Sequence, residues 1–183
     1  AMNDVIKGKA KENDVYKIEL LMKQAKISTE MRRTVPAALA EAARECGPAA
    51  AIELPDGSIE TGKTSNLLGA SAALLLNAVK ALGNIPHGTH LISPTAIEPI
   101  QKLKVDYLGS KNPRLHTDEV LIALSMCAAT DKNAQIALEQ LPKLKHCQVH
   151  TSVMLSEVDI KTFKKLGVGL TSEPVYEHNR LYH

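Results

Sequence analysis

Apolar side chains are most concentrated in residues 67–82, where only Ser71, Asn77 and Lys80 are clearly polar. A helix with so few polar positions has no side that suits contact with water. The pattern therefore predicts a helix over residues 66–82 that lies buried at the centre of a domain.

Two short β-prone runs precede this helix. Residues 49–54 and 58–62 flank Asp56 and Gly57, and an Asp-Gly pair between such runs is a strong signal for a β-hairpin. We therefore expect a hairpin that leads directly into the buried helix.

The rest of the chain alternates between the two kinds of secondary structure. Because strands separated by helices need crossover connections, the order predicts an α/β fold, a mixed sheet covered by helices. The pattern predicts strands at 89–92, 148–155 and 168–172, helices at 93–108, 117–129, 131–141 and from Ser156 to Leu166, and a polar tail at 173–183.

The first 46 residues differ in character from the remaining 137 residues of the 183-residue chain. They hold nine Lys/Arg and seven Asp/Glu, which leaves 13 of each in the remainder, and their pattern is helical. We expect a helical linker or small subdomain at 1–46 and an α/β three-layer domain at 47–183. A neutral main body argues against a nucleic-acid partner, because duplex binding needs a broad basic surface.

The cysteines and the ends of the chain suggest a cellular context. Three cysteines with no Cys-x-x-Cys pair indicate free thiols in a reducing cytoplasm. No apolar run approaches the roughly 18 to 20 residues of a membrane span, so no membrane contact is expected. Ala1 before Met2 resembles a cloning remnant, so we expect a missing N-terminal part of a longer chain as one partner.

Residues 57–64, Gly-Ser-Ile-Glu-Thr-Gly-Lys-Thr, match the phosphate-binding pattern G-x-x-x-x-G-K-[ST]. Such a loop surrounds phosphate with backbone N–H groups while its lysine neutralises the charge. Glu60, however, places an acid where phosphate would lie, and Asp56-Gly57 fits a hairpin turn. Nucleotide binding at Gly57–Thr64 and a hairpin followed by a capped helix are the two alternatives.

A second polar cluster precedes the predicted helix at 117–129, and helix N-termini bind anions. A small carboxylate or phosphate is the ligand that such a cluster would hold. The candidate ligand-binding residues lie ahead of the two apolar helices: Lys63, Thr64, Ser65, Lys111, Asn112, Arg114, His116 and Thr117.

The sequence does not define a catalytic set. His146 and His150 flank Cys147 and would share a face of a strand, which with His116 or Glu119 would allow zinc, but spacing alone is a weak signal and no metal site is expected. His90 is expected in a strand as a hydrogen-bonded core residue. No G-x-S-x-G or H-E-x-x-H motif occurs, so catalytic residues and cofactors stay unassigned.

Three segments carry a resemblance to a known family: residues 53–65 (ELPDGSIETGKTS), 115–130 (LHTDEVLIALSMCAAT) and 163–174 (FKKLGVGLTSEP). They resemble the C-terminal part of the bacterial family called domain of unknown function 1846. The resemblance implies a helical subdomain followed by a cytidine-deaminase-like topology. Deaminase chemistry does not carry over, because it needs a His or Cys beside a glutamate on one helix and Pro-Cys-x-x-Cys on the next.

These observations leave three functional hypotheses. The first is an assembly or co-catalytic domain of a larger cytoplasmic protein, without a complete active site of its own and forming a homo-oligomer. The second is a binding or enzymatic site for a small anionic metabolite at the helix N-termini. The third is nucleotide binding at Gly57–Thr64.

Overall fold

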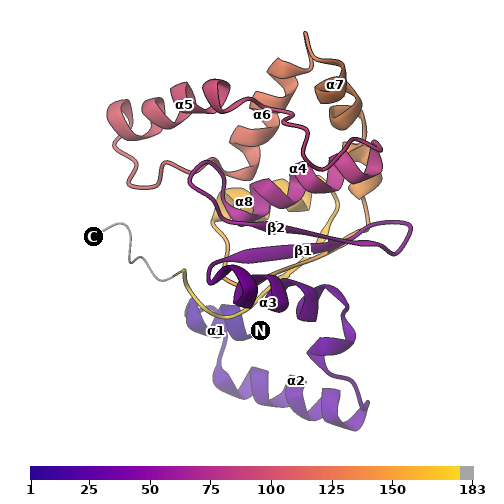
Figure 1. The fold of residues 1–183 in the computed structure, drawn as a ribbon. Helices are drawn as coiled ribbons and strands as arrows, with labels where there is room; N and C mark the ends of the chain where they lie inside the picture. Colours follow the sequence, from indigo (N-terminus) through magenta and orange to yellow (C-terminus); the bar gives the residue numbers. More distant parts are fainter. Residues whose placement is uncertain (178–183) are drawn as a thin grey trace.

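The protein is built around a four-stranded mixed sheet, which confirms the predicted α/β class (Figure 1). The computed structural model describes residues 1 to 177. The strands are β1 (Ala49–Glu53), β2 (Ile59–Lys63), β3 (Gln148–Thr151) and β4 (Gly169–Ser172), in the order β2-β1-β3-β4. β1 runs antiparallel to both of its neighbours, whereas β3 and β4 are parallel.

Helices cover both faces of the sheet (Figure 1). One face is covered by α3 (Thr34–Glu45) and the other by α4 (Ala70–Leu82) and α8 (Glu157–Lys165). Beyond α4 lie α5 (Pro94–Lys102), α6 (Thr117–Cys127) and α7 (Lys132–Glu139). On the other side of the sheet, α1 (Met2–Ile6) lies against β4, where Asn3 donates to the Ser172 hydroxyl at 2.7 Å, and α2 (Glu12–Gln24) lies beyond α3. Single helical turns occur at Thr29–Met31, Leu103–Tyr107 and Leu141–Leu144, the second of them π-helical.

The alanine run in β1 is explained by helices on both sides of this strand. Residues 49–52 are all fully buried, and successive side chains of a strand point to opposite faces. Ala50 and Ile52 join the core formed with α4, and α3 packs against the same strand from the other face. Small side chains allow both helices to approach the backbone closely.

The predicted hairpin is confirmed, and it explains both glycines of the phosphate-like pattern. Ala49 pairs with Lys63 and Glu53 with Ile59, while Gly57 has a φ of 82° in the turn. At Gly62, a Cβ atom would collide with the backbone of Leu74 and lie 2.7 Å from the carbonyl oxygen of Ala70. Gly62 therefore permits close contact between β2 and α4, and residues 57–64 do not form a phosphate-binding loop.

Two local predictions are wrong. Residues 89–92 form no strand; Leu91 and Ile92 are buried in an irregular segment that lies beside α4, and His90 is exposed. The buried helix begins at Ala70 rather than at residue 66, because the Ser65 hydroxyl accepts hydrogen bonds from the amides of Leu67 and Leu68 and holds these residues in a turn. A short apolar run indicates burial without fixing its secondary structure.

The first 46 residues are helical, as predicted, and α3 packs on β1, β2 and β3. Arg32, just before α3, donates a hydrogen bond to the carbonyl oxygen of Val149 in β3 at 2.9 Å. The division into domains at residue 46 stays a prediction. Within residues 1–177, no helix combines the length and apolar character needed to cross a membrane. Residues 178–183 of the predicted tail lie outside the described residues.

Candidate functional site

The N-termini of α4, α6 and α8 meet at a cavity of about 210 Å³. The N-cap residues that immediately precede these helices, Gly69, His116 and Ser156, all line it. A parallel β-bridge between Leu68 and Leu115 holds the first two helix ends together, and the amide of Gly69 donates to the carbonyl oxygen of Leu115 at 3.2 Å. The site is thus assembled from segments far apart in the sequence.

The N-terminus of α4 faces this cavity without a side-chain cap. Its first intrahelical hydrogen bond is the one that Ala73 donates to Gly69 at 3.0 Å, so the amides of residues 70–72 have no acceptor within the helix. Ser71 is only 4% exposed, and its hydroxyl has no hydrogen-bond partner among the described residues. A buried hydroxyl without a partner is costly, which points to a ligand that supplies one.

Across the cavity, His116 is held by a buried carboxylate. Asp159, 7% exposed, lies with Oδ2 3.1 Å from Nδ1 of His116. Asp159 also accepts hydrogen bonds from the Ser156 hydroxyl at 2.8 Å and from the amide and hydroxyl of Thr117 at 2.9 and 2.8 Å. Because an ionised carboxylate only accepts hydrogen bonds, Nδ1 donates, and Nε2 is the ring nitrogen that remains for a ligand.

This network shifts both pKa values in the direction of an ion pair. The hydrogen bond to Asp159 raises the pKa of His116 above 6.5, against the opposing effect of burial. Burial alone would raise the pKa of Asp159, but the hydrogen bonds from His116, Thr117 and Ser156 outweigh it and lower the pKa below 3.8. Both shifts favour the ionised forms, a protonated imidazole beside a carboxylate.

Arg114 forms one wall of the cavity. Its Nε donates to the carbonyl oxygen of Ser65 at 2.8 Å, and its Nη1 lies 2.9 Å from a carboxylate oxygen of Glu177. Asn112 positions this arginine, since its side-chain oxygen accepts a hydrogen bond from the Arg114 amide at 3.0 Å. Glu177 also lines the cavity, so the wall carries one positive and one negative charge.

Four of the eight predicted ligand residues line this cavity: Thr64, Asn112, Arg114 and His116. Thr117 is fully buried behind them and bonded to Asp159. Lys63 instead pairs with Glu45 of α3 at 2.7 Å, and Ser65 caps the turn ahead of α4. Lys111 is exposed and does not line the cavity.

Sequence patterns alone assign no role at this site to Ser71 or Asp159. Ser156 caps the start of α8, since its hydroxyl accepts a hydrogen bond from the Asp159 amide at 3.2 Å. The second role of Asp159, toward His116, depends on the packing of α8 against α6. The available signal for Ser71 was its position as a polar residue at the start of an apolar helix.

The described part of the chain contains no group of three or more His, Cys, Asp or Glu residues that could hold a metal ion. His146 precedes β3 with a φ of 70°, so it does not share a strand face with His150. The ring of His150 contacts Thr171 and Glu173 at 2.8 and 3.0 Å.

Comparison with known proteins places the chain in a family. The family model described as "Domain of unknown function DUF1846, C-terminal" matches residues 30–182. The chain belongs to the DUF1846 family. The match covers the sheet, the three helix N-termini and every residue that lines the cavity.

Several relatives are named UPF0371 proteins. The chain is 54% identical to one from Corynebacterium urealyticum over 166 residues, which is 91% of this chain and 33% of the relative. It is 47% identical to one from Streptococcus pyogenes serotype M5 over 171 residues, 93% of this chain and 35% of the relative. The DUF1846 chain described here thus spans about a third of the length of these relatives, as a C-terminal domain of a larger protein would.

Proposed function

We propose that this DUF1846 domain binds a small anionic group, a phosphate or a carboxylate, in the cavity between α4, α6 and α8. The observation that carries the proposal is the uncapped N-terminus of α4, with the buried, unpartnered hydroxyl of Ser71, on the same cavity as the His116–Asp159 pair. Backbone N–H groups at a helix N-terminus and the helix dipole both favour negative charge.

The groups that line the cavity are suited to stabilise negative charge. A ligand oxygen would accept hydrogen bonds from the α4 amides and from the Ser71 hydroxyl, while protonated His116 would donate from Nε2. The same donors would stabilise negative charge that develops on a reacting group. In this sense the domain is co-catalytic: it supplies anion-binding groups to a larger protein whose remaining sequence supplies the rest.

The cytidine-deaminase-like topology belongs to the same proposal. The hairpin of β1 and β2, which leads into α4 and, after α5, α6 and α7, into a strand that pairs with β1, supports it. The helix N-termini present hydrogen-bond donors to the cavity, so the proposed chemistry is anion recognition.

Isothermal titration calorimetry with inorganic phosphate, and then with a dicarboxylate such as succinate, tests the proposal. Ser71→Ala should weaken binding by roughly 10- to 100-fold, because it removes a hydrogen bond to a charged ligand. The matched control is Ser125→Ala on the exposed side of α6, which should leave affinity unchanged. Absence of binding by both probes, or equal affinity in the two variants, would contradict the proposal.

A further inference from the structure

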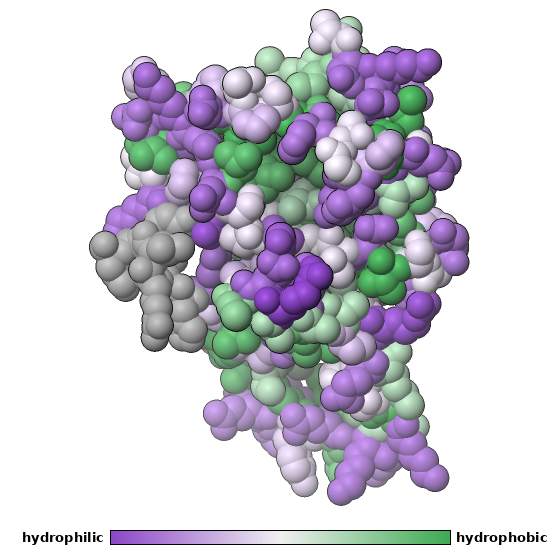
Figure 2. Space-filling view, in the orientation of Figure 1, coloured by the Kyte–Doolittle hydropathy of each residue, from purple (hydrophilic) through white to green (hydrophobic). Residues whose placement is uncertain are grey.

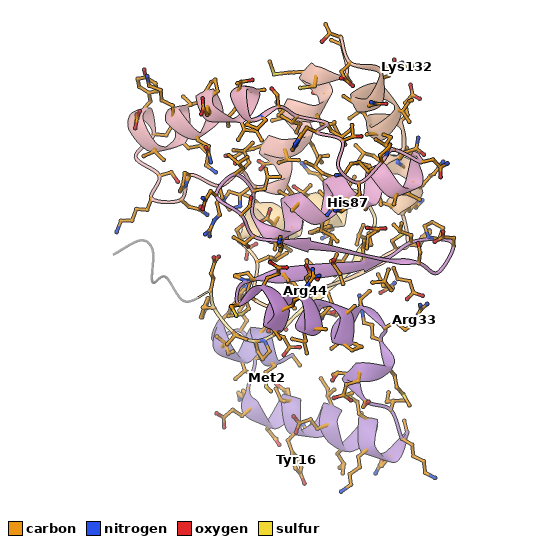
Figure 3. The ribbon with its side chains drawn as sticks, viewed as in Figure 1. Met2, Tyr16, Arg33, Arg44, His87 and Lys132 are labelled. Atoms are coloured by element: carbon orange, nitrogen blue, oxygen red, sulfur yellow. The ribbon has the colours of Figure 1, made fainter. Side chains whose placement is uncertain are left out.

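The helix α2 exposes large apolar side chains. None of its residues is buried, and Tyr16 and Leu21 are 63% and 62% exposed. Ile18 and Leu20 are exposed as well, and we call these four residues the α2 surface. Figure 3 shows Tyr16 extending from α2 on the side that faces away from the sheet. In the space-filling view, the end of the molecule that carries α1 and α2 is a narrow lobe below the wider body (Figure 2).

The α2 surface extends over more than one side of the helix. Tyr16 and Leu20 are four residues apart and Ile18 and Leu21 are three apart, so each pair occupies one face, and the two faces differ. Val15 and Met22, half-buried, lie on the side between them. A surface helix typically carries one apolar stripe, so large apolar side chains on two different faces of α2 indicate more than one packing partner.

Within the described residues, α2 has few packing contacts with other elements. It packs against the five-residue helix α1, and Figure 1 shows it beyond α1 and α3, away from the sheet. A 13-residue helix is marginal in water without tertiary contacts. Its stability in the full protein therefore requires a further packing partner.

We infer that the α2 surface is buried against the part of the full-length polypeptide that precedes the C-terminal domain. The family model of this domain begins at residue 30, after the end of α2 at Gln24. The DUF1846 relatives are about three times as long as the segment that they share with this chain. The α2 helix thus lies outside the C-terminal domain and belongs structurally to the preceding one.

A second copy of this chain is the competing occupant. The family boundary favours the preceding domain, because α2 is excluded from the sequence model while all elements from α3 onward are included. An interface between copies of the C-terminal domain would be expected to use elements within that model. The inference is independent of the anion-binding proposal, since no residue of α2 lines the cavity.

Thermal unfolding of Leu21→Lys in two settings tests the inference. In chain 1–183, where Leu21 is exposed, the substitution should leave the Tm unchanged. In the full-length polypeptide it should lower the Tm by about 4 °C or more, because a charge would replace a buried apolar group. The control is Gln24→Lys, which adds the same charge to an exposed polar position of α2 and should change neither Tm.

Two results would overturn the inference. An unchanged Tm for Leu21→Lys in the full-length polypeptide would show that the α2 surface stays exposed there. A concentration-dependent dimer of chain 1–183 in sedimentation velocity, lost in Leu21→Lys, would identify a second copy as the occupant. A strict monomer, together with a Tm drop confined to the full-length polypeptide, would support the inference.

Discussion

Asp159 of α8 holds His116, the N-cap residue of α6, with 3.1 Å between Oδ2 and Nδ1. The same carboxylate accepts the first helical amide of α6, that of Thr117, at 2.9 Å. One buried side chain thus caps a helix, orients an imidazole and joins two helices that are 43 residues apart in sequence at this contact. The contribution of Asp159 to the free energy of unfolding and the ionisation of the Asp159–His116 pair can both be measured.

Asp159→Asn should lower the free energy of unfolding by about 2 to 4 kcal/mol. The amide cannot accept all four hydrogen bonds, and charged hydrogen bonds are worth about 1.5 to 3 kcal/mol each. Urea unfolding monitored by circular dichroism measures the change. Asp118→Asn is the control: it changes an exposed acid in the first turn of α6, the helix that Asp159 caps, and should cost about 0.5 kcal/mol. Equal losses in the two variants would show that Asp159 contributes only as a helix-terminal charge.

The pH dependence of stability should contain an identifiable contribution from the pair. The folded-state pKa of His116 is raised, so its stabilisation is complete below about 6.5 and is lost as pH rises through the higher folded value. The pKa of Asp159 is lowered, so its stabilisation is present above about 3.8 and is lost as pH falls through the lower folded value. The pair therefore stabilises the fold most between these limits.

The difference in urea midpoint between the wild type and His116→Gln, measured from pH 3 to 9, isolates this contribution. Asp159, Lys104 and Glu119 are the charged groups that act on His116 from three different elements, and Arg114 and Glu177 line the same cavity. His150 acts in the opposite sense, since burial lowers its pKa and its effect destabilises the fold as pH falls below 6.5. A difference that does not vary with pH would exclude the ion pair.

Gly62→Ala should destabilise the protein by about 3 kcal/mol. The new methyl group would collide with the backbone of Leu74 and lie 2.7 Å from the carbonyl oxygen of Ala70, so α4 would have to move away from β2. Thermal unfolding measures the effect. Gly88→Ala, where nothing lies within 4 Å, should be nearly neutral. A small effect at both positions would mean that the contact between α4 and β2 adjusts easily.

The sequence correctly predicts those helices and strands whose local residue pattern matches their surroundings in the fold. The Asp56-Gly57 hairpin and the apolar helix ending at Leu82 are both present, as are the helices begun by Asp131 and Ser156. Residues 89–92 were predicted wrongly because burial beside α4 gives the same apolar signal as a strand.

The cavity was predictable only in part. Arg114 and His116 were found because basic residues ahead of an apolar helix have no packing role. Ser71 and Asp159 reach the same cavity through the Leu68–Leu115 bridge and the packing of α8 on α6, contacts between segments distant in sequence. No local pattern encodes such proximity, and Lys63 shows the converse, since its neighbour in the structure is Glu45.

Glu177→Gln should tighten binding of inorganic phosphate by roughly fivefold. Glu177 lines the cavity and carries the negative charge beside Arg114, so it repels an anion at the α4 N-terminus, and removing one nearby charge is worth about 1 kcal/mol near a protein surface. Arg114 keeps its hydrogen bond to the carbonyl oxygen of Ser65, so the wall of the cavity is retained. Calorimetric titration at low ionic strength measures the gain, and it should shrink at high salt as screening increases. The control is Glu157→Gln, which removes the same charge from an exposed position of α8 that does not line the cavity. An equal gain in both variants would reflect net charge alone, whereas a gain confined to Glu177→Gln would place the bound anion in this cavity.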